Sequence, residues 1–211
     1  MRVLELFAGS RSIGKAAEAL GHTVLSTDIE DYGGIDVLGD ILQIPMDVWK
    51  DFAPDMIWAS PPCTAFSVAS IGHHWTGGAR AYVPKTEGAV LGQMLMRHTL
   101  RIIEEVRPSV WFMENPRGLM RKMPEMEALP IRHTVTYCQY GDTRMKPTDI
   151  WTNCTTWKPR PMCKNGASCH EAAPRGARTG TQGRSNAHER SKIPEALCID
   201  VIQAASIFAE P

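Results

Sequence analysis

Two prolines and a cysteine, Pro61-Pro62-Cys63, directly follow the apolar run 56–59 and are well placed for covalent chemistry. Each proline fixes its φ angle and lacks a backbone N–H, so the loop has few conformations to lose when a substrate binds. A thiolate is a strong nucleophile that needs little activation. The pattern favours a nucleophilic cysteine at the end of a strand, while a small apolar residue that closes the strand would fit it too.

Glu114 is a carboxyl group that could work together with this cysteine, because it follows a second apolar run at 110–113. Its neighbours Trp111, Phe112 and Pro116 should exclude water and make the carboxylate easier to protonate. A protonated carboxyl group could donate a proton or a hydrogen bond to a heterocycle while the thiolate attacks.

Basic residues gather in the C-terminal third of a chain whose net charge is zero, with 23 basic and 23 acidic residues. The neutral total argues mildly against a nucleic-acid binder, but the basic third favours a surface that faces phosphates. Arg144 and Lys146 would project to one side of an extended stretch and could stabilise anionic charge. The candidates for contact with nucleic acid are Lys146, Arg160, Arg175, Arg178 and Arg184.

Gly9 and Gly14 frame a loop with small residues between the first predicted strand and the first predicted helix. It would let a ligand approach the backbone, and the N-terminus of the next helix would offer free N–H groups. Asp28 stands at the end of the second predicted strand, where a carboxylate can bind ribose hydroxyls. Asp40 and Ile41 could line an adenine ring. A surface acid in a turn is the alternative for both aspartates.

The elements that would position these residues alternate between strand and helix through the first half of the chain. Apolar runs predict strands at 3–7, 22–27, 55–59 and 110–113, and helical spacing predicts helices at 12–20, at 87–106 and from Ile193 onwards. The pattern predicts an α/β fold with a doubly wound, mostly parallel sheet covered on both faces. Ligands bind such sheets at the carboxyl ends of the strands. Five candidate residues lie at predicted strand ends: Gly9, Asp28, Asp40, Cys63 and Glu114.

Residues 152–190 interrupt this pattern, since they are rich in Gly, Pro, Arg, Thr and Ser and show little periodicity. We predict one domain made of 1–151 and 191–211, with 152–190 as an irregular basic insert. Four potential ligands make the insert a candidate structural zinc site: Cys154, Cys163, Cys169 and His170. Free thiols in a loop are the alternative, because the spacing fits no common zinc finger.

The motifs resemble, in the same order, those of the S-adenosylmethionine-dependent DNA cytosine-5 methyltransferases. The family's F-x-G-x-G is similar to 7–11, with Arg11 in place of the second glycine, and its PPCQxFS resembles 61–67, with Thr64 in place of glutamine. Its ENV resembles 114–116.

Two later motifs continue the resemblance. The family's QxRxR is similar to 143–146, with Arg144 kept and Lys146 in place of the second arginine. The final GNAVPP-type segment is similar to 190–195.

The resemblance implies a Rossmann-like class I methyltransferase fold, S-adenosylmethionine as cofactor and DNA, as a duplex, as substrate. Cys63 would add to C6 of a flipped-out cytosine, Glu114 would contact N3 and the exocyclic amine, and Arg144 would steady the base or a phosphate. The implied cofactor-binding residues are Phe7, Ala8, Gly9, Ser10, Ile13, Asp28, Ile29, Asp40, Ile41, Pro61, Ser191 and Ile193.

The family usually carries a sizeable target-recognition domain where this chain has only the insert 152–190, which is therefore a candidate reduced target-recognition region. Its small size leaves single-stranded nucleic acid or a free pyrimidine nucleotide as alternative substrates. A non-catalytic DNA-binding relative is a further alternative, against which the intact Cys63, Glu114 and Arg144 argue.

The chain contains no apolar run of the roughly 18 residues that a membrane span needs, and its N-terminus lacks a signal pattern. We therefore expect a cytoplasmic protein whose six cysteines stay reduced. A phage origin, with action in a host cytoplasm, is a hypothesis suggested by the small size. The sequence indicates no protein partner.

Overall fold

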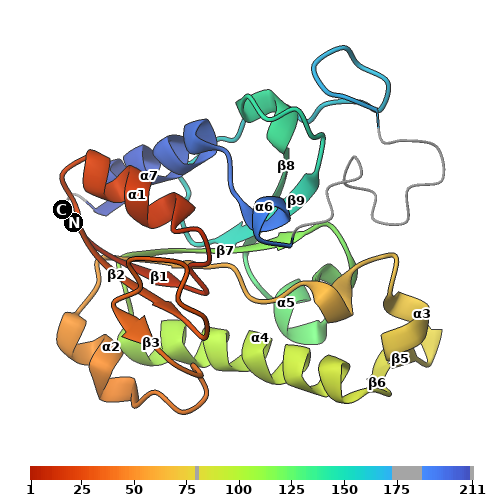
Figure 1. Cartoon of the computed structure of the whole chain (residues 1–211), viewed down its shortest axis with the longest axis horizontal. Helices are drawn as coiled ribbons and strands as arrows, with labels where there is room; N and C mark the ends of the chain where they lie inside the picture. Colours follow the sequence, from red (N-terminus) through yellow and green to blue (C-terminus); the bar gives the residue numbers. More distant parts are fainter. Residues whose placement is uncertain (79–80, 173–186, 210–211) are drawn as a thin grey trace.

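A seven-stranded sheet forms the centre of the protein in this computed structural model, which describes residues 1–78, 81–172 and 187–209 (Figure 1). The strands are β1 (Arg2–Leu6), β2 (Thr23–Asp28), β3 (Val37–Leu38), β4 (Met56–Ala59), β7 (Val110–Pro116), β8 (Ile131–Thr136) and β9 (Pro147–Thr152). Their order is β3-β2-β1-β4-β7-β9-β8, and all run parallel except β9, which is antiparallel to both neighbours. The order reverses between β1 and β4, where ligands bind in sheets of this type.

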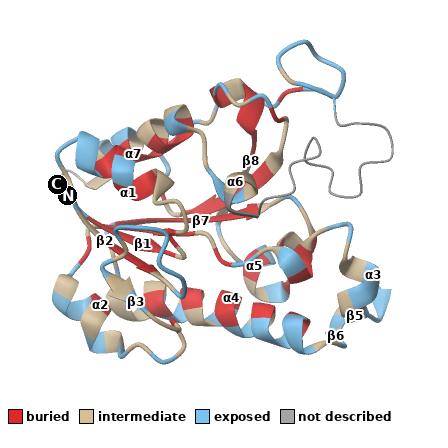
Figure 2. Cartoon of the chain, viewed as in Figure 1, coloured by how far each residue is buried: buried red, intermediate tan, exposed pale blue. Residues whose placement is uncertain are grey.

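Helices cover both faces of the sheet (Figure 1). On one face lie α1 (Ser12–Ala19) and α7 (Glu195–Ala209), and on the other lie α2 (Met46–Phe52), α4 (Glu87–Val106) and α5 (Pro124–Glu127). Alternate strand residues feed two cores: Leu4 and Leu6 pack on the α4 side, and Val3 packs on the α1 side. Figure 2 shows the strands buried between the helices, as a parallel sheet with two covered faces requires.

Short elements complete the described chain. They are η1 (Thr64–Phe66), α3 (Ile71–His74), β5 (Trp75–Thr76), β6 (Val83–Pro84), η3 (Leu119–Lys122), η4 (Tyr137–Tyr140) and α6 (Ala187–Ser191). β5 and β6 pair as a separate two-stranded sheet. No helix among the described residues is both long enough and apolar enough to cross a bilayer.

The fold class predicted from the sequence, a doubly wound and mostly parallel sheet, is confirmed. The predicted end of one strand is wrong, because β7 continues to Pro116 rather than stopping at Met113. β4 ends opposite Met113, and the extra residues pair instead with β9, where Glu114 stands opposite Ile150. The antiparallel strand β9 was not predicted, and it is what extends β7 past the end of β4.

The insert 152–190 begins inside the hydrophobic core rather than outside it. Trp157 is buried, with its ring 5.6 Å from that of Phe112, and its Nε1 donates to Asp200 of α7 at 3.0 Å. Cys154 is also part of this core. After β9, the described residues up to 172 contain no helix or strand, as expected for an irregular segment.

Candidate active site

Cys63 lies on the loop that connects β4 to η1, and both ends of this loop are held. Asn115 of β7 donates from Nδ2 to the Pro61 carbonyl at 2.9 Å. On the other side, Trp75 donates from Nε1 to the Ala65 carbonyl at 2.6 Å. The two prolines and these two hydrogen bonds leave the Cys63 backbone little freedom, as a nucleophile on a rigid support requires.

A close approach between two chain segments also fixes the residues after Cys63. A Cβ atom at Gly118 would come within 2.3 Å of the Phe66 carbonyl oxygen, and one at Gly92 of α4 would come within 3.3 Å of the Phe66 ring. Phe66 itself is fully buried. Glycine at these two positions therefore allows η1 to pack directly on α4 and on the chain that follows β7.

Glu114 is buried beside this loop at the end of β7. Tyr137 of η4 donates from its hydroxyl group to Glu114 Oε1 at 3.1 Å. Burial raises the pKa of Glu114, while the charge of Lys146 and hydrogen bonds from Tyr137 and Ser60 partly oppose the rise. The desolvation expected from the sequence is therefore present, and it favours a protonated carboxyl group.

Cys63 is partly buried, and the charges of Glu114, Lys146 and Arg190 act on its thiol. Burial raises the pKa of Cys63, and the charge of Glu114 raises it further, whereas Lys146 and Arg190 lower it. Burial lowers the pKa of Lys146, and the charges of Glu114 and Cys63 act against that change. Cys63, Glu114 and Lys146 thus form one electrostatic group.

Lys146 and Arg144 have different surroundings. Lys146 donates from Nζ to the Arg190 carbonyl at 3.0 Å, and its ammonium group lies 4.5 Å from the centre of the Tyr137 ring. Both contacts keep it next to Glu114 and Cys63 rather than on an outer surface. The sequence had suggested contact with phosphates for this residue.

The guanidinium of Arg144 is 1% exposed and fully occupied by the protein's own oxygens. Its Nε donates to both carboxylate oxygens of Asp142 at 3.0 Å, and Nη2 makes an ion pair with the same group. Its Nη1 donates to the carbonyls of Glu189 and Arg190, and Nη2 also donates to that of Lys192. All five N–H groups of the side chain are used, so in this structure Arg144 fastens the segment 189–192 and has no donor left for a substrate.

A cavity of about 370 Å³ lies at the carboxyl ends of β1, β2, β3 and β4, where the strand order reverses. It adjoins the cysteine loop through Ser60 and Pro62. The cavity is lined by Phe7, Gly9, Thr27, Asp28, Ile29, Glu30, Tyr32, Gly39, Asp40, Ile41, Ser60, Pro62, Leu91, Leu95 and Ser191. This is the volume and the mixture of apolar walls with a few polar groups that small-molecule sites show.

Seven of the cofactor residues predicted from the sequence line this cavity: Phe7, Gly9, Asp28, Ile29, Asp40, Ile41 and Ser191. Five others do not line it, and their contact with the cofactor stays a prediction: Ala8, Ser10, Ile13, Pro61 and Ile193. Ile13 is buried against the sheet, and the Pro61 carbonyl is taken by Asn115 while its neighbours Ser60 and Pro62 line the wall. Ile193 does not line the cavity, but its backbone N–H donates to Ser12 Oγ at the start of α1 at 3.2 Å.

Asp28 organises the rim of the cavity. Its Oδ2 accepts a hydrogen bond from the Gly9 backbone N–H at 2.8 Å, and its Oδ1 accepts one from the Glu30 N–H at 3.1 Å. Gly9 has a φ of 50°, in the left-handed region that suits glycine. One carboxylate therefore joins the end of β2 to the loop after β1.

The loop after β1 enters α1 through Arg11, which has a φ of 55° although it is not glycine. Its Nε donates to Ser26 Oγ at 3.1 Å, and its Nη2 makes an ion pair with Glu18. Behind it, the buried carboxylate of Glu5 accepts the backbone N–H groups of Ile13 and Gly14 at 3.0 and 3.1 Å. Burial raises the pKa of Glu5 to about 7, so this α1 terminus is held by a group that titrates near neutrality.

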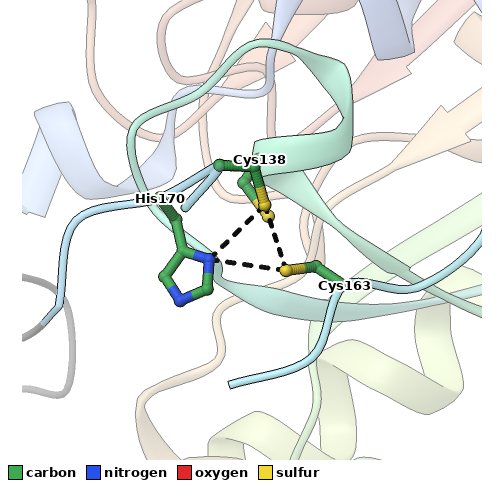
Figure 3. A group of neighbouring side chains, drawn as sticks. Cys138, Cys163 and His170 are labelled. Carbon is green, nitrogen blue, oxygen red and sulfur yellow. Dashed lines mark hydrogen bonds between the residues drawn. The ribbon is translucent and has the colours of Figure 1, made fainter. Parts of the chain in front are cut away.

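The cysteine and histidine residues of the insert form a cluster, but its members differ from those predicted. Cys163, Cys169 and His170 come together with Cys138 of η4, and their ligand atoms all lie within 4.8 Å of one another. Figure 3 shows the labelled side chains of Cys138, Cys163 and His170 pointing toward one another. Cys154 is not part of the group, because it is buried in the core with its Sγ 3.3 Å from Thr156 Oγ1.

The basic residues predicted to contact nucleic acid are only partly described. Arg160 is bound to its own chain, donating from Nη1 to the Gln139 carbonyl at 2.8 Å and lying 4.7 Å from the centre of the Tyr140 ring. Arg175, Arg178 and Arg184 lie outside the described residues.

Several residues that shape the site were missed at the level of sequence, namely Ser60, Asn115 and Tyr137. Asn115 stood inside the Glu114-Asn115-Pro116 motif, so its position was a signal. Tyr137 is brought to Glu114 by the fold, at a separation of 23 residues, and no local pattern marks it.

Comparison with known proteins agrees with this geometry. The family model of the C-5 cytosine-specific DNA methylases matches residues 1–141. A relative from Frog virus 3 (isolate Goorha), named "Probable DNA (cytosine-5)-methyltransferase", is 30% identical over 219 residues, which cover 96% of this chain and 99% of that protein.

Two solved structures share the fold. A protein described as a DNA modification methyltransferase encoded within an E. coli prophage has a TM-score of 0.55 at 15% identity, over 77% of this chain and 52% of that one. The Entamoeba histolytica methyltransferase EhMeth has a TM-score of 0.54 at 13% identity, over 78% and 57%. The chain thus spans little more than half the length of these two proteins.

Proposed function

The chain belongs to the family of C-5 cytosine-specific DNA methylases, and we propose that it methylates C5 of cytosine in duplex DNA with Cys63 as the nucleophile. The family and the DNA cytosine-5 methyltransferase function predicted from the sequence are confirmed by the match to residues 1–141 and by the viral relative. The observation that supports the residue roles is the electrostatic group of Cys63, Glu114 and Lys146 beside a cavity at the switch point of the sheet.

In the proposed reaction, the Cys63 thiolate forms a bond to C6 of a cytosine that has left the base stack. The electron pair of the C5=C6 bond moves to C5, which would take the methyl group from the sulfonium sulfur of S-adenosylmethionine; the methyl–sulfur bond would break and the donor would leave as the neutral thioether. The proton at C5 then leaves to water, the double bond returns and the sulfur–C6 bond breaks, so Cys63 is regenerated.

Glu114 supplies the hydrogen bond that makes the ring accept this electron pair. Since burial raises the pKa of Glu114, its carboxyl group is held ready to donate to N3 of the cytosine. Tyr137 positions the carboxyl group through its own hydrogen bond to Oε1.

Lys146 replaces Arg144 as the cation that we assign to the reacting ring. Its ammonium group interacts with both Cys63 and Glu114, so it can stabilise negative charge that develops on the ring after the sulfur adds. Arg144 is a positioning residue in this proposal, because its donors hold the segment that carries Ser191 to the wall of the cavity.

The cavity suits S-adenosylmethionine, which supplies an electrophilic methyl group when bound. Asp28 offers a carboxylate to ribose hydroxyls, and Phe7, Ile29 and Ile41 offer apolar surface to an adenine ring. The cavity adjoins the Cys63 loop at Ser60 and Pro62, which would bring the methyl group and the cytosine together.

Replacing Asp28 with alanine tests the cofactor site. We expect the affinity for S-adenosylmethionine, measured by calorimetry, to fall by about 1–3 kcal/mol, because the carboxylate and its hold on Gly9 are both lost. Asp28→Asn is the matched control, since it keeps an oxygen acceptor for the Gly9 N–H and should lose less. Unchanged affinity in Asp28→Ala would show that Asp28 is a surface acid only.

The substrate is tested by transfer of a tritiated methyl group to duplex DNA, single-stranded DNA and a free cytidine nucleotide in parallel. We expect incorporation at C5 of cytosine in the duplex and none with Cys63→Ser. Cys154→Ser removes a buried thiol outside the site and should remain active. Transfer restricted to the single strand or the nucleotide would replace the duplex substrate, and no transfer to any substrate would favour a non-catalytic DNA-binding protein.

A further inference from the structure

Four side chains from two separate parts of the chain form a compact ligand set that the methyl transfer does not use. Cys138 comes from η4, directly after β8, whereas Cys163, Cys169 and His170 come from the insert. The four ligand atoms lie within 4.8 Å of one another, and the described residues contain no other such group of three or more. Three sulfurs and one imidazole nitrogen are the donor set of many structural zinc sites.

The distances within the cluster are close to those around a tetrahedral zinc ion. With Zn–S bonds of about 2.3 Å and a Zn–N bond of about 2.1 Å, sulfurs are about 3.8 Å apart and sulfur and nitrogen about 3.6 Å apart. Nδ1 of His170 lies 3.4 Å from Cys163 Sγ and 3.6 Å from Cys169 Sγ. Cys163 Sγ and Cys169 Sγ are 3.1 Å apart, so a zinc ion would have to spread these two sulfurs by about 0.7 Å.

Hydrogen bonds outside the cluster hold its members in place. The Cys163 backbone N–H donates to Thr136 Oγ1 at 2.8 Å, and the Glu171 N–H donates to the Thr143 carbonyl at 2.9 Å. The Gln139 side chain donates from Nε2 toward Cys169 Sγ at 3.5 Å, the kind of outer contact that orients a metal-binding thiolate. The cluster is therefore fixed at both ends by contacts that do not depend on the cysteine side chains.

We propose that Cys138, Cys163, Cys169 and His170 bind a structural zinc ion in a closed Cys₃His site. Each of the three thiols gives up its proton on binding, and the imidazole binds through Nδ1, so no coordination position remains for water or substrate. Cys63 is not a ligand and stays available for the reaction.

The ion would tie the insert to the loop that supports the active site. η4 contains Tyr137, which is bonded to Glu114, and the chain continues from η4 to Lys146. One metal centre would thus fasten the described residues 153–172, which contain no helix or strand, to the catalytic side of the sheet. Binding energy from a structural zinc ion can stabilise a segment that has so little regular structure.

The test is the metal content and ligand environment of the purified protein, measured without reference to activity. Protein prepared without chelators should contain close to one zinc ion per chain by elemental analysis, and X-ray absorption should show three sulfur neighbours and one nitrogen neighbour. Replacement of zinc with Co²⁺ should give the absorption bands of a tetrahedral thiolate site. Cys138→Ser and Cys163→Ser should each lower the affinity for Co²⁺ at least tenfold.

Cys154→Ser and Cys198→Ser are the matched controls, because both remove buried thiols outside the cluster and should keep full metal content. Should the cluster variants fail to fold, chelator treatment of the wild-type protein gives the second measurement, in which hydrogen exchange should rise first in 163–171. Metal-free wild-type protein, loss of metal in Cys154→Ser, or a Cys163–Cys169 disulfide in protein kept under reducing conditions would each overturn the proposal. None of these outcomes depends on methyl transfer, so they are separate from failure of the proposed function.

Discussion

At the level of single residues, the site shifts both reacting groups toward their protonated forms. Burial raises the pKa of Cys63 and of Glu114, whereas the positive charge of Lys146 lowers both pKa values. A protonated Glu114 suits a hydrogen bond to cytosine, but Cys63 must lose its proton to attack. We therefore expect the thiolate to form late, when the base has entered and water has been excluded.

The pH dependence of Cys63 alkylation tests this electrostatic group. Burial and the charge of Glu114 raise the pKa of Cys63, so alkylation should increase with pH and have its midpoint above that of an exposed cysteine. Glu114→Gln removes a negative charge and should lower the midpoint, whereas Lys146→Met removes a positive charge and should raise it. Mass spectrometry of the Cys63 peptide gives the rates. Equal midpoints in all three proteins would show that the charges do not interact.

Replacing Arg144 should mainly lower the stability of the protein, whereas replacing Lys146 should mainly lower the rate of methyl transfer. Arg144→Met removes the buried ion pair with Asp142 and the hydrogen bonds to the carbonyls of the segment 189–192, so the free energy of unfolding should fall by about 3–5 kcal/mol. Lys146→Met should lower the rate of methyl transfer by roughly 10²–10³, as loss of a charge-stabilising group does, with a smaller effect on stability. Denaturant unfolding and single-turnover rates separate the two. A catalytic defect in Arg144→Met without loss of stability would show that Arg144 acts on the substrate, as the sequence had predicted.

At the level of elements, the loop between β1 and α1 shows how this chain accommodates a departure from its family's pattern. Arg11 stands where the family has glycine, and it adopts the left-handed conformation that glycine favours. That conformation costs a non-glycine residue about 1–2 kcal/mol. The contacts of the Arg11 side chain with Ser26 and Glu18 offset part of this cost.

Two substitutions at Arg11 separate the backbone cost from the side-chain contacts. Both Arg11→Ala and Arg11→Gly lose the contacts with Ser26 and Glu18, but only alanine keeps the strained backbone. We expect the glycine variant to be more stable than the alanine variant by up to about 1 kcal/mol in denaturant unfolding. An alanine variant of equal or higher stability would show that the left-handed conformation carries no cost here.

The elements that could be predicted from sequence are those with a strong local pattern. β1, β4 and α4 have apolar runs or helical spacing, and their positions agree with the prediction to within a few residues. β9 could not be predicted because it begins with Pro147 and continues through polar residues that tertiary contacts bury. Asp149, for example, is fully buried and forms an ion pair with Arg121 of η3.

Local sequence pattern also limits how much of the active site and of the cysteine–histidine cluster could be predicted. Cys63, Glu114 and Asp28 could be found because each ends a recognisable strand. Cys138 is 25 residues from Cys163 in sequence, and only the pairing of β8 with β9 and the return of the insert bring them together. Cys154 was chosen instead because it lies in the insert, but its position next to Trp157 places it in the core.

At the level of the whole molecule, the sheet brings the proposed catalytic residues and the cavity together at one edge. The β4 loop brings Cys63, β7 brings Glu114, and the chain between η4 and β9 brings Lys146, while the cavity opens at the ends of the first four parallel strands. The chain aligns with little more than half of each of the two solved structures that share its fold, yet with nearly the whole of the viral relative. We propose that the insert 152–190 and the rim of the cavity contact the DNA.

The most direct measurement of the central claim is covalent trapping on duplex DNA that contains 5-fluorocytosine, in the presence of S-adenosylmethionine. Because fluorine at C5 cannot leave as a proton does, the sulfur–C6 bond should persist after methyl transfer. We predict a denaturation-resistant protein–DNA species whose attachment maps to Cys63 by mass spectrometry and which Cys63→Ser does not form. Methylation of ordinary cytosine by a protein that forms no such species, or that forms it at a residue other than Cys63, would contradict the account.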